Sequence, residues 1–527
     1  MSTVPLLLRL PSKWFTEFFS ESFDTPSSIG MSNTADPLFF RLPEAWLASF
    51  LSEWLEMPSI GMLDTAMSSK KHREQFLKSL QNMRSSSIDG FCQRAVYGFL
   101  VGFDRWKMYL WRWLSIRQIF VERIKLNTND VRSDFVIPSL REAVANFSED
   151  ADLCYLVNNC PALRSLTLAF AEVSHVGLGM LTNLHGSLEE FSLSIPMRKT
   201  NDPSFTYGKQ FAATLVDMLC GCSHLQKVSL TGESLRCFAN YDDLLPFGHL
   251  FHELQLKRWG RSVTFFPDLL TTCTNLRELR YECHGMEQDV MVWTAICHCP
   301  LLTVLRIINS LPNQEDHRIR IADLFGHISR SCRHLRDLSL DSCRIPISIL
   351  QSVAGMENLR TLSVADFDGL PDAGMAVLAT TRLEILSFAT DKCSADVSLQ
   401  SLVGSNISQT LVILVVLSTG SDPLVDDVRL ATALASCHNL KTLRVYYESC
   451  LFGSEGLQAV AAGCPLLKDV SLYFTVEGIH YLGEHVASLQ QVAACNGCAR
   501  GSHTPAGFPS VQKLQTLYPA VKWVYGN

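Results

Sequence analysis

The chain lacks a basic excess, long apolar runs and the short motifs of common enzymes. It has 45 Lys and Arg against 52 Asp and Glu, a formal net charge of −7, which argues against binding to a phosphate backbone. The most apolar run, Leu411 to Leu417, is far too short to span a bilayer. A nucleophile elbow, a phosphate-binding glycine loop and an H-E-x-x-H motif are all absent from the sequence. We therefore expect no catalysis, no nucleic acid partner and no membrane partner.

The 18 cysteines do not indicate a disulfide framework or a metal site. Residues 1–10 contain a proline and an arginine and end without a small-residue cleavage site, unlike a signal peptide. We therefore expect a cytoplasmic or nuclear protein with reduced thiols. The groups Cys495/Cys498/His503 and Cys297/His298/Cys299 are incomplete as zinc sites, because structural zinc needs four closely spaced ligands. We expect neither a metal nor another cofactor.

A block of roughly 27 residues recurs about fourteen times between Val121 and Val492. Its fixed part is an L-x-x-L-x-L strand, as in Leu335, Leu338 and Leu340. Amphipathic helical stretches follow several strands, including 211–219, 289–297, 321–329 and 456–461. A free cysteine packs as a small apolar residue, which suits the turn from helix into strand. Seven cysteines stand three residues before the first strand leucine: Cys160, Cys222, Cys273, Cys299, Cys332, Cys437 and Cys464.

This period and pattern resemble leucine-rich repeats of the cysteine-containing type, whose units must stack because one unit cannot bury its apolar face alone. We predict an α/β fold: a leucine-rich-repeat solenoid shaped as a horseshoe over residues 121–494. Residues 495–527 are predicted to form a C-terminal cap. The insertions around 196–207 and 312–318 are predicted to project as loops, because insertions in solenoids avoid the stacked core.

In residues 41–82 the apolar residues are spaced differently from those of the repeats, and this spacing predicts three short helices. The order Leu42-Pro43-Glu44, Leu47, Phe50-Leu51 and Trp54-Leu55, continued by Ile60, Leu63 and Ala66, resembles an F-box, a small all-α domain. The resemblance implies that this domain docks a Skp-type adaptor on a cullin scaffold. The residues that would make this contact are Leu42, Pro43, Leu47, Phe50, Leu51 and Leu55.

Two further N-terminal segments flank the F-box-like domain. Residues 1–38 repeat its opening pattern but break off early, so we interpret them as a partial, poorly ordered duplicate. Residues 83–120 are rich in aromatic side chains, which predicts a helical linker that packs as an N-terminal cap.

Side chains alternate along a strand, so the residues between the repeat leucines should face the inner surface of the horseshoe. Arg, Tyr and Trp anchor many interfaces. On this basis the predicted partner-binding residues are Lys257, Trp259, Arg280, Arg306, Arg444 and Tyr446. The first four would suit an acidic or phosphorylated partner; the alternative is a solvated charged face, with the partner bound elsewhere.

Together with the repeats, the F-box resemblance implies the substrate-recognition subunit of a cullin-type ubiquitin ligase, which holds a protein substrate in the horseshoe. The alternative is a leucine-rich-repeat scaffold or inhibitor without a ubiquitin role, whose N-terminal helices only cap the solenoid. The two hypotheses differ in whether residues 41–80 present an apolar helical face to a partner.

Overall fold

A computed structural model describes most of the repeat region and little of the chain before it. The described residues are 70–81, 122–126, 139–145, 150–169, 173–195, 209–232, 242–257, 266–282, 289–308, 315–341, 347–367, 372–390, 399–418, 427–446, 452–472, 476–486, 488–495 and 511–526. The chain divides into two compact units, Met1–Ser165 and Leu166–Asn527.

The first unit contains two helices and two strands among its described residues: α4 (Lys70–Gln81), β1 (Arg123–Leu126), β2 (Glu142–Ala145) and α6 (Asp150–Asn159). Helix α4 occupies the place predicted for the third helix of residues 41–82, and its Phe76 is fully buried. Strands β1 and β2 pair in parallel. The six predicted adaptor-binding residues, from Leu42 to Leu55, lie outside the described residues.

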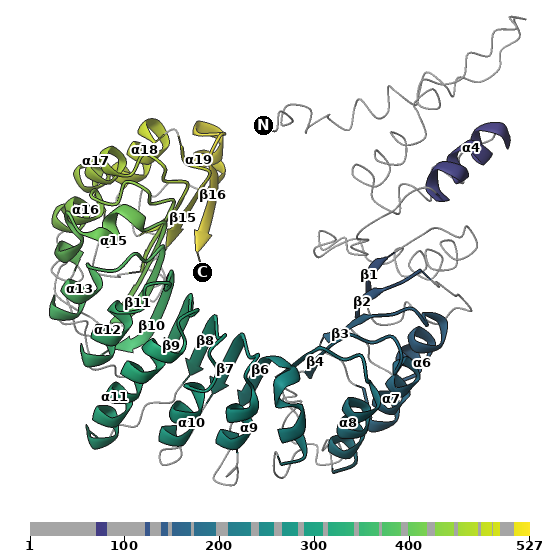
Figure 1. The fold of residues 1–527 in the computed structure, drawn as a ribbon. Coiled ribbons are helices and arrows are strands. Elements are labelled where there is room, and N and C mark those ends of the chain that lie inside the picture. Colours follow the sequence, from purple (N-terminus) through teal and green to yellow (C-terminus); the bar gives the residue numbers. More distant parts are fainter. Residues whose placement is uncertain are drawn as a thin grey trace, which may run out of the picture. The chain divides into compact units, whose positions relative to one another are not determined.

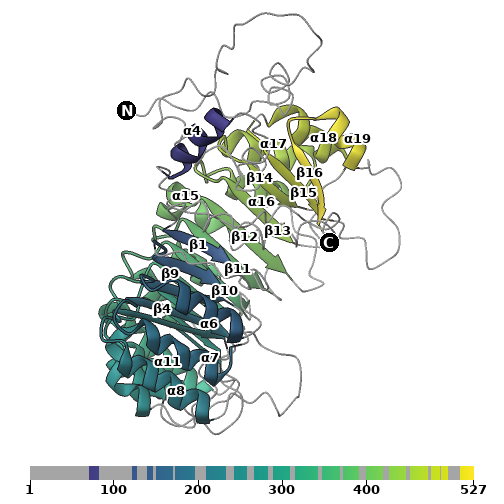
Figure 2. The same ribbon diagram turned by 90° about the vertical axis from the view of Figure 1, so that its right-hand side faces the viewer.

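The second unit is a parallel sheet in which the strands follow one another in chain order, with helices along one face (Figures 1 and 2). The strands are β3 (Ser165–Ala169), β4 (Glu190–Ile195), β5 (Lys227–Gly232), β6 (Phe251–Lys257), β7 (Glu278–Glu282), β8 (Val304–Ile308), β9 (Asp337–Asp341), β10 (Thr361–Phe367), β11 (Ile385–Thr390), β12 (Ile413–Ser418), β13 (Thr442–Tyr446), β14 (Asp469–Leu472), β15 (Gln491–Cys495) and β16 (Lys522–Gly526). This confirms the predicted α/β repeat architecture.

The connecting α-helices are α7 (His175–Met180), α8 (Lys209–Gly221), α9 (Phe266–Thr272), α10 (Asp289–Ile296), α11 (Glu315–Ser331), α12 (Ile347–Ala354), α13 (Asp372–Leu378), α15 (Asn406–Thr410), α16 (Asp427–Leu434), α17 (Ser454–Gly463), α18 (Val476–His485) and α19 (Val511–Leu517). Short 3₁₀ helices replace or extend them at η2 (Leu181–Leu184), η4 (Asp242–Leu250) and η5 (Gln400–Leu402). Each connection returns the chain to the same edge of the sheet, because all strands run in one direction.

Leucine ladders between the strands and the helices form the core. The register aligns Leu279 with Leu305, and Leu305 with Leu338. Each of these leucines has no exposed surface. An isolated unit would leave such side chains in water, so burial of each leucine depends on the repeats on either side of it.

The seven cysteines that stand three residues before a strand leucine lie in the turns that lead from a helix into the next strand. In every case the carbonyl of the cysteine accepts a hydrogen bond from the N–H of the first strand leucine, at 3.0–3.2 Å. All seven side chains are buried. Burial raises the pKa of Cys273, Cys332 and Cys464 to about 12 each. These thiols therefore stay protonated and unreactive.

Some thiols and asparagines also hydrogen-bond to the preceding repeat, which the sequence patterns did not predict. The thiol of Cys332 donates to the carbonyls of Ile296 and Cys299, each at 3.5 Å, and the thiol of Cys464 donates to Leu434 at 3.3 Å. The last carbonyls of a helix have no partner within that helix. The next repeat therefore satisfies them.

The asparagine directly before a strand leucine acts in the same way. The amides of Asn275, Asn358 and Asn439 donate to the carbonyls of His249, Arg333 and Gln409, at 2.7, 2.8 and 2.5 Å. Each bond joins the turn of one repeat to the helix end or turn of the repeat before it. The edge at which the strands begin is consequently held by side-chain bonds as well as by the sheet.

Three features differ from the sequence-based expectation. The structure adds strand β2, where Ala143 and Ala145 stand in place of repeat leucines, and strand β16, which pairs in parallel with β15. Residues 495–527 thus contribute one more strand to the sheet. The segment 315–318, expected in a projecting loop, belongs to helix α11.

We predict that Leu362→Ala lowers the free energy of unfolding by about 2–5 kcal/mol, because truncating a fully buried leucine leaves a cavity. Denaturant unfolding followed by circular dichroism measures the change. Ser363→Ala is the control, because this neighbouring side chain points to the opposite face and is half-buried. Equal losses from the two variants would contradict the register of β10.

Candidate binding surface

The face of the sheet opposite the helices, here called the open face, carries the side chains that alternate with the buried leucines. In β7, Leu279 and Tyr281 are buried, whereas Glu278, Arg280 and Glu282 are partly exposed. The same alternation holds in β3, β4, β8 and β13. Most open-face residues are small hydroxyl residues or charged residues.

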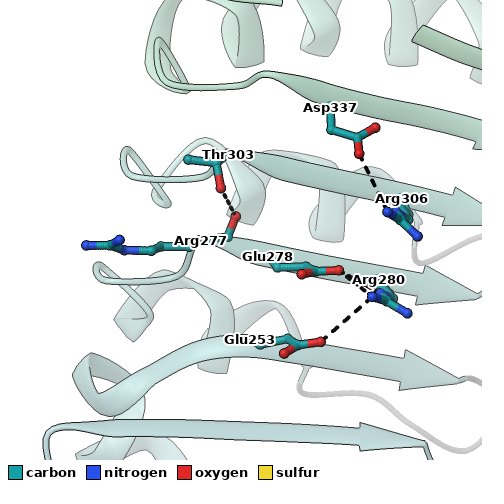
Figure 3. A network of polar contacts seen from close by, with 7 residues as sticks. All are labelled: Glu253, Arg277, Glu278, Arg280, Thr303, Arg306 and Asp337. Carbon is teal, nitrogen blue, oxygen red and sulfur yellow. Dashed lines mark hydrogen bonds and ion pairs between the residues drawn. The ribbon is translucent and has the colours of Figure 1, made fainter. Parts of the chain in front are cut away.

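Five side chains on β6 to β9 form a charged network on this face (Figure 3). Arg280 donates through Nε to Glu278 Oε1 at 2.7 Å, and its Nη2 lies 4.0 Å from Glu253 Oε1. Arg306 Nη2 lies 3.5 Å from Asp337 Oδ2. The carboxylates come from neighbouring strands as well as from the arginine's own strand, so the sheet register brings the network together.

The charged network leaves no surplus of positive charge. Two guanidinium groups face three carboxylates, a formal net charge of −1. Burial raises the pKa of Glu253 above its ordinary value, and Glu278 raises it further, whereas Arg280 lowers it. The carboxylates already occupy the positions that an acidic or phosphorylated partner would need to reach the arginines.

Two of the other predicted partner-binding residues, Arg444 and Tyr446, lie on a strand outside this network. Lys257 is the last residue of β6, and Trp259 lies outside the described residues. Arg444 and Tyr446 both lie on β13, on the open face. The Arg444 side chain is exposed and makes no hydrogen bond or ion pair with the described part of the chain. The Tyr446 hydroxyl accepts a hydrogen bond from Ser471 at 3.3 Å.

Beside Arg444 lies an aliphatic patch that the sequence analysis missed, formed by Ile385, Ile413, Val415 and Leu417 on β11 and β12. The register aligns Val415 with Arg444, and Leu417 with Tyr446. All four aliphatic side chains are partly exposed on the open face. The sequence signal for the three residues on β12 is the apolar run 411–417, in which both faces of one strand are apolar, rather than only the buried face.

The described residues contain no group of three or more His, Cys, Asp or Glu side chains that could hold a metal ion. Cys297 is partly buried next to fully buried Cys299, while Cys498 and His503 lie outside the described residues. Among the helices that the structure describes, none is long and apolar enough to cross a membrane.

Comparison with known proteins adds little to this geometry. No family model matches the chain, and no curated protein matches it in sequence. Among solved structures, an internalin from Listeria monocytogenes is similar, with 13% identity and a TM-score of 0.32. The match covers 68% of this chain and 81% of the internalin. The fold of the chain, a repeated parallel strand and helix with a leucine core, is a leucine-rich-repeat architecture on its own evidence.

We predict that Arg280→Met lowers the free energy of unfolding at neutral pH by about 1 kcal/mol or less, because the pairs are partly exposed. The loss should shrink in acid, since protonation of Glu253, whose pKa is raised, removes its repulsion with Glu278. Denaturant unfolding at neutral and acidic pH measures both effects. Arg444→Met, which breaks no ion pair among the described residues, should show no such pH dependence. An equal loss from Arg280→Met at both pH values would mean that Arg280 acts by packing.

Proposed function

We propose that the chain is a non-catalytic scaffold that binds a protein partner on the open face, centred on β11 to β13. The observation that carries this proposal is the aliphatic patch beside Arg444 and Tyr446. Aliphatic side chains, an arginine and a tyrosine side by side are typical of interface centres, where apolar contact and directed hydrogen bonds act together. On a face that stays hydrated and binds no partner, these four aliphatic side chains would contribute nothing to stability.

The side chains of this surface define the kind of partner that fits. Apolar residues of the partner would cover Val415 and Leu417, and a carboxylate next to them would pair with the exposed guanidinium of Arg444. The charged network on β6 to β9 would flank this contact. Its arginines, held by their own carboxylates, favour a partner surface of mixed charge over a strongly acidic one.

We further propose that the scaffold serves as the substrate-recognition subunit of a cullin-type ubiquitin ligase in the cytoplasm or nucleus. The support is the F-box resemblance of residues 41–82, together with helix α4 at the position of its third helix. A scaffold or inhibitor without a ubiquitin role is the alternative, and it shares the same partner-binding face.

Variants on the open face test the first proposal. Leu417→Asp and Arg444→Glu should each weaken partner binding by roughly tenfold or more, because a carboxylate in an apolar contact is costly to desolvate and the reversed charge repels the partner. The measurement is quantitative mass spectrometry of partners that co-purify with each variant.

The matched control is Leu466→Asp, because Leu466 is an exposed leucine in the turn before β14 rather than on the open face. Unchanged thermal melting must accompany the Leu417→Asp result. Partners retained by both open-face variants but lost with Leu466→Asp would move the binding surface to the turns.

The adaptor interaction has its own test. Leu51→Asp should abolish co-purification of a purified Skp-type adaptor, because it places a carboxylate in an apolar helix interface. Deletion of residues 1–38, the partial duplicate, should leave adaptor binding intact. Wild-type protein that never retains the adaptor, or a Leu51→Asp variant that retains it equally well, would favour the scaffold alternative.

A further inference from the structure

The five turns that lead into β7 to β11 form an arginine-rich edge of the sheet. Within residues 273–277, 299–303, 332–336, 356–360 and 380–384 the charged residues are five arginines and two glutamates. We call the five arginines the basic edge: Arg277, Arg333, Arg336, Arg360 and Arg382. The whole chain has a negative formal charge, so the positive charge of these turns is opposite in sign to the net charge of the chain.

Backbone hydrogen bonds join each of these turns to the next, so that the turns lie in one row. The N–H of Thr303 donates to Arg277, that of Arg336 to Thr303, and that of Arg360 to Arg336, at 2.8–2.9 Å. Successive turns are therefore one strand spacing apart, and the five turns span about 19 Å. Thr303 Oγ1 also donates to the Arg277 carbonyl at 2.9 Å, and the Asn358 amide donates to the Arg333 carbonyl at 2.8 Å. These bonds thus fix the backbone that carries the arginines before any partner binds.

Three of the five guanidinium groups are free of hydrogen bonds and ion pairs within the described part of the chain. Arg277, Arg333, Arg336 and Arg382 are exposed. Among the described residues, the side chains of Arg277, Arg336 and Arg382 make no hydrogen bond or ion pair. Figure 3 shows the Arg277 side chain pointing away from the charged network. Arg333 donates through Nε to the Arg330 carbonyl at 3.2 Å, and Arg360 donates through Nη1 to the Arg382 carbonyl at 3.4 Å. Among the five arginines, Arg360 alone pairs with a carboxylate of the described residues, its Nε lying 3.5 Å from Glu384 Oε1.

The basic edge is interrupted on both sides. The adjacent equivalent positions are His252, at the start of β6, and Val412, just before β12. Beyond Val412 the same position carries Lys441 and then Lys468, so the basic residues do not form a continuous track. A long nucleic acid needs a continuous basic track, and here it would meet the carboxylates of the open face and the negative charge of the rest of the chain. A short acidic segment in extended form, with carboxylates over about 19 Å, matches the length and the charge.

We propose that the basic edge is a second binding surface, which takes an acidic segment of a partner protein independently of the aliphatic patch. Guanidinium groups on a fixed backbone form bidentate bonds with carboxylates. The edge would add charge recognition, and faster association, to the apolar contact on the open face.

The test uses the full chain and a fluorescent oligoglutamate peptide long enough to cover the five turns. Fluorescence anisotropy measures its affinity over a range of salt concentrations. Wild type should bind the peptide with an affinity that falls as salt rises, and Arg336→Glu should weaken binding by about tenfold at low salt. Arg336→Gln, which removes the charge without reversing it, should have an intermediate effect.

Lys468→Glu is the matched control for net charge. Lys468 is exposed at the same edge but lies before β14, about 14 Å beyond the turn that carries Arg382, which exceeds the screening length at physiological salt. At that salt it should leave peptide affinity nearly unchanged. Equal effects of Arg336→Glu and Lys468→Glu when both are measured at physiological salt, or no binding of oligoglutamate at low salt, would overturn the proposal. A single-stranded oligonucleotide of equal charge that binds more tightly, and depends on Arg336, would overturn it in favour of nucleic acid. None of these outcomes bears on Leu417→Asp, which tests the aliphatic patch.

Discussion

Burial of each repeat's leucines by its neighbours is the interaction on which the rest of the second unit depends. Leu279, Leu305 and Leu338 lie in one row, and each loses its exposed surface only because the strands on both sides are present. This requirement fixes the strand register. Once the register is fixed, the alternating residues must lie in rows on the open face, so the core determines which surface side chains meet.

The turn before each strand adds a second constraint. A buried cysteine there fills a small apolar space, and its thiol can also satisfy a helix carbonyl of the preceding repeat, as Cys332 and Cys464 do. Gly463 shows how closely these turns approach, because a Cβ at this position would collide with the backbone of Ala435. Stacking of the turns keeps the strand-start edge regular, and this regularity places Arg277, Arg336 and Arg360 in single file.

Much of the fold could be predicted because leucine spacing reports directly on burial. Strand β2 was missed because Ala143 and Ala145 occupy leucine positions, and short side chains weaken the apolar signal without preventing burial. The surface was harder to predict. Arg280 and Arg306 were predicted to suit an acidic or phosphorylated partner. Their carboxylate partners include Glu253 and Asp337, which are far from them in the sequence and on other strands, so the leucine pattern did not indicate the pairing.

The open face and the strand-start edge use charge differently, for a geometric reason. Side chains on the open face have neighbours in register on two adjacent strands, so an arginine there can find a carboxylate across the sheet, as Arg306 finds Asp337. At the edge, side chains leave the sheet, and Arg277 and Arg336 have no such neighbour among the described residues, although Arg360 pairs with Glu384 of the next turn. Exposed arginines without local partners retain more of their field at a distance than paired ones do. The edge would therefore attract an acidic segment while it is still at a distance. The aliphatic patch contributes to binding only after close contact excludes water.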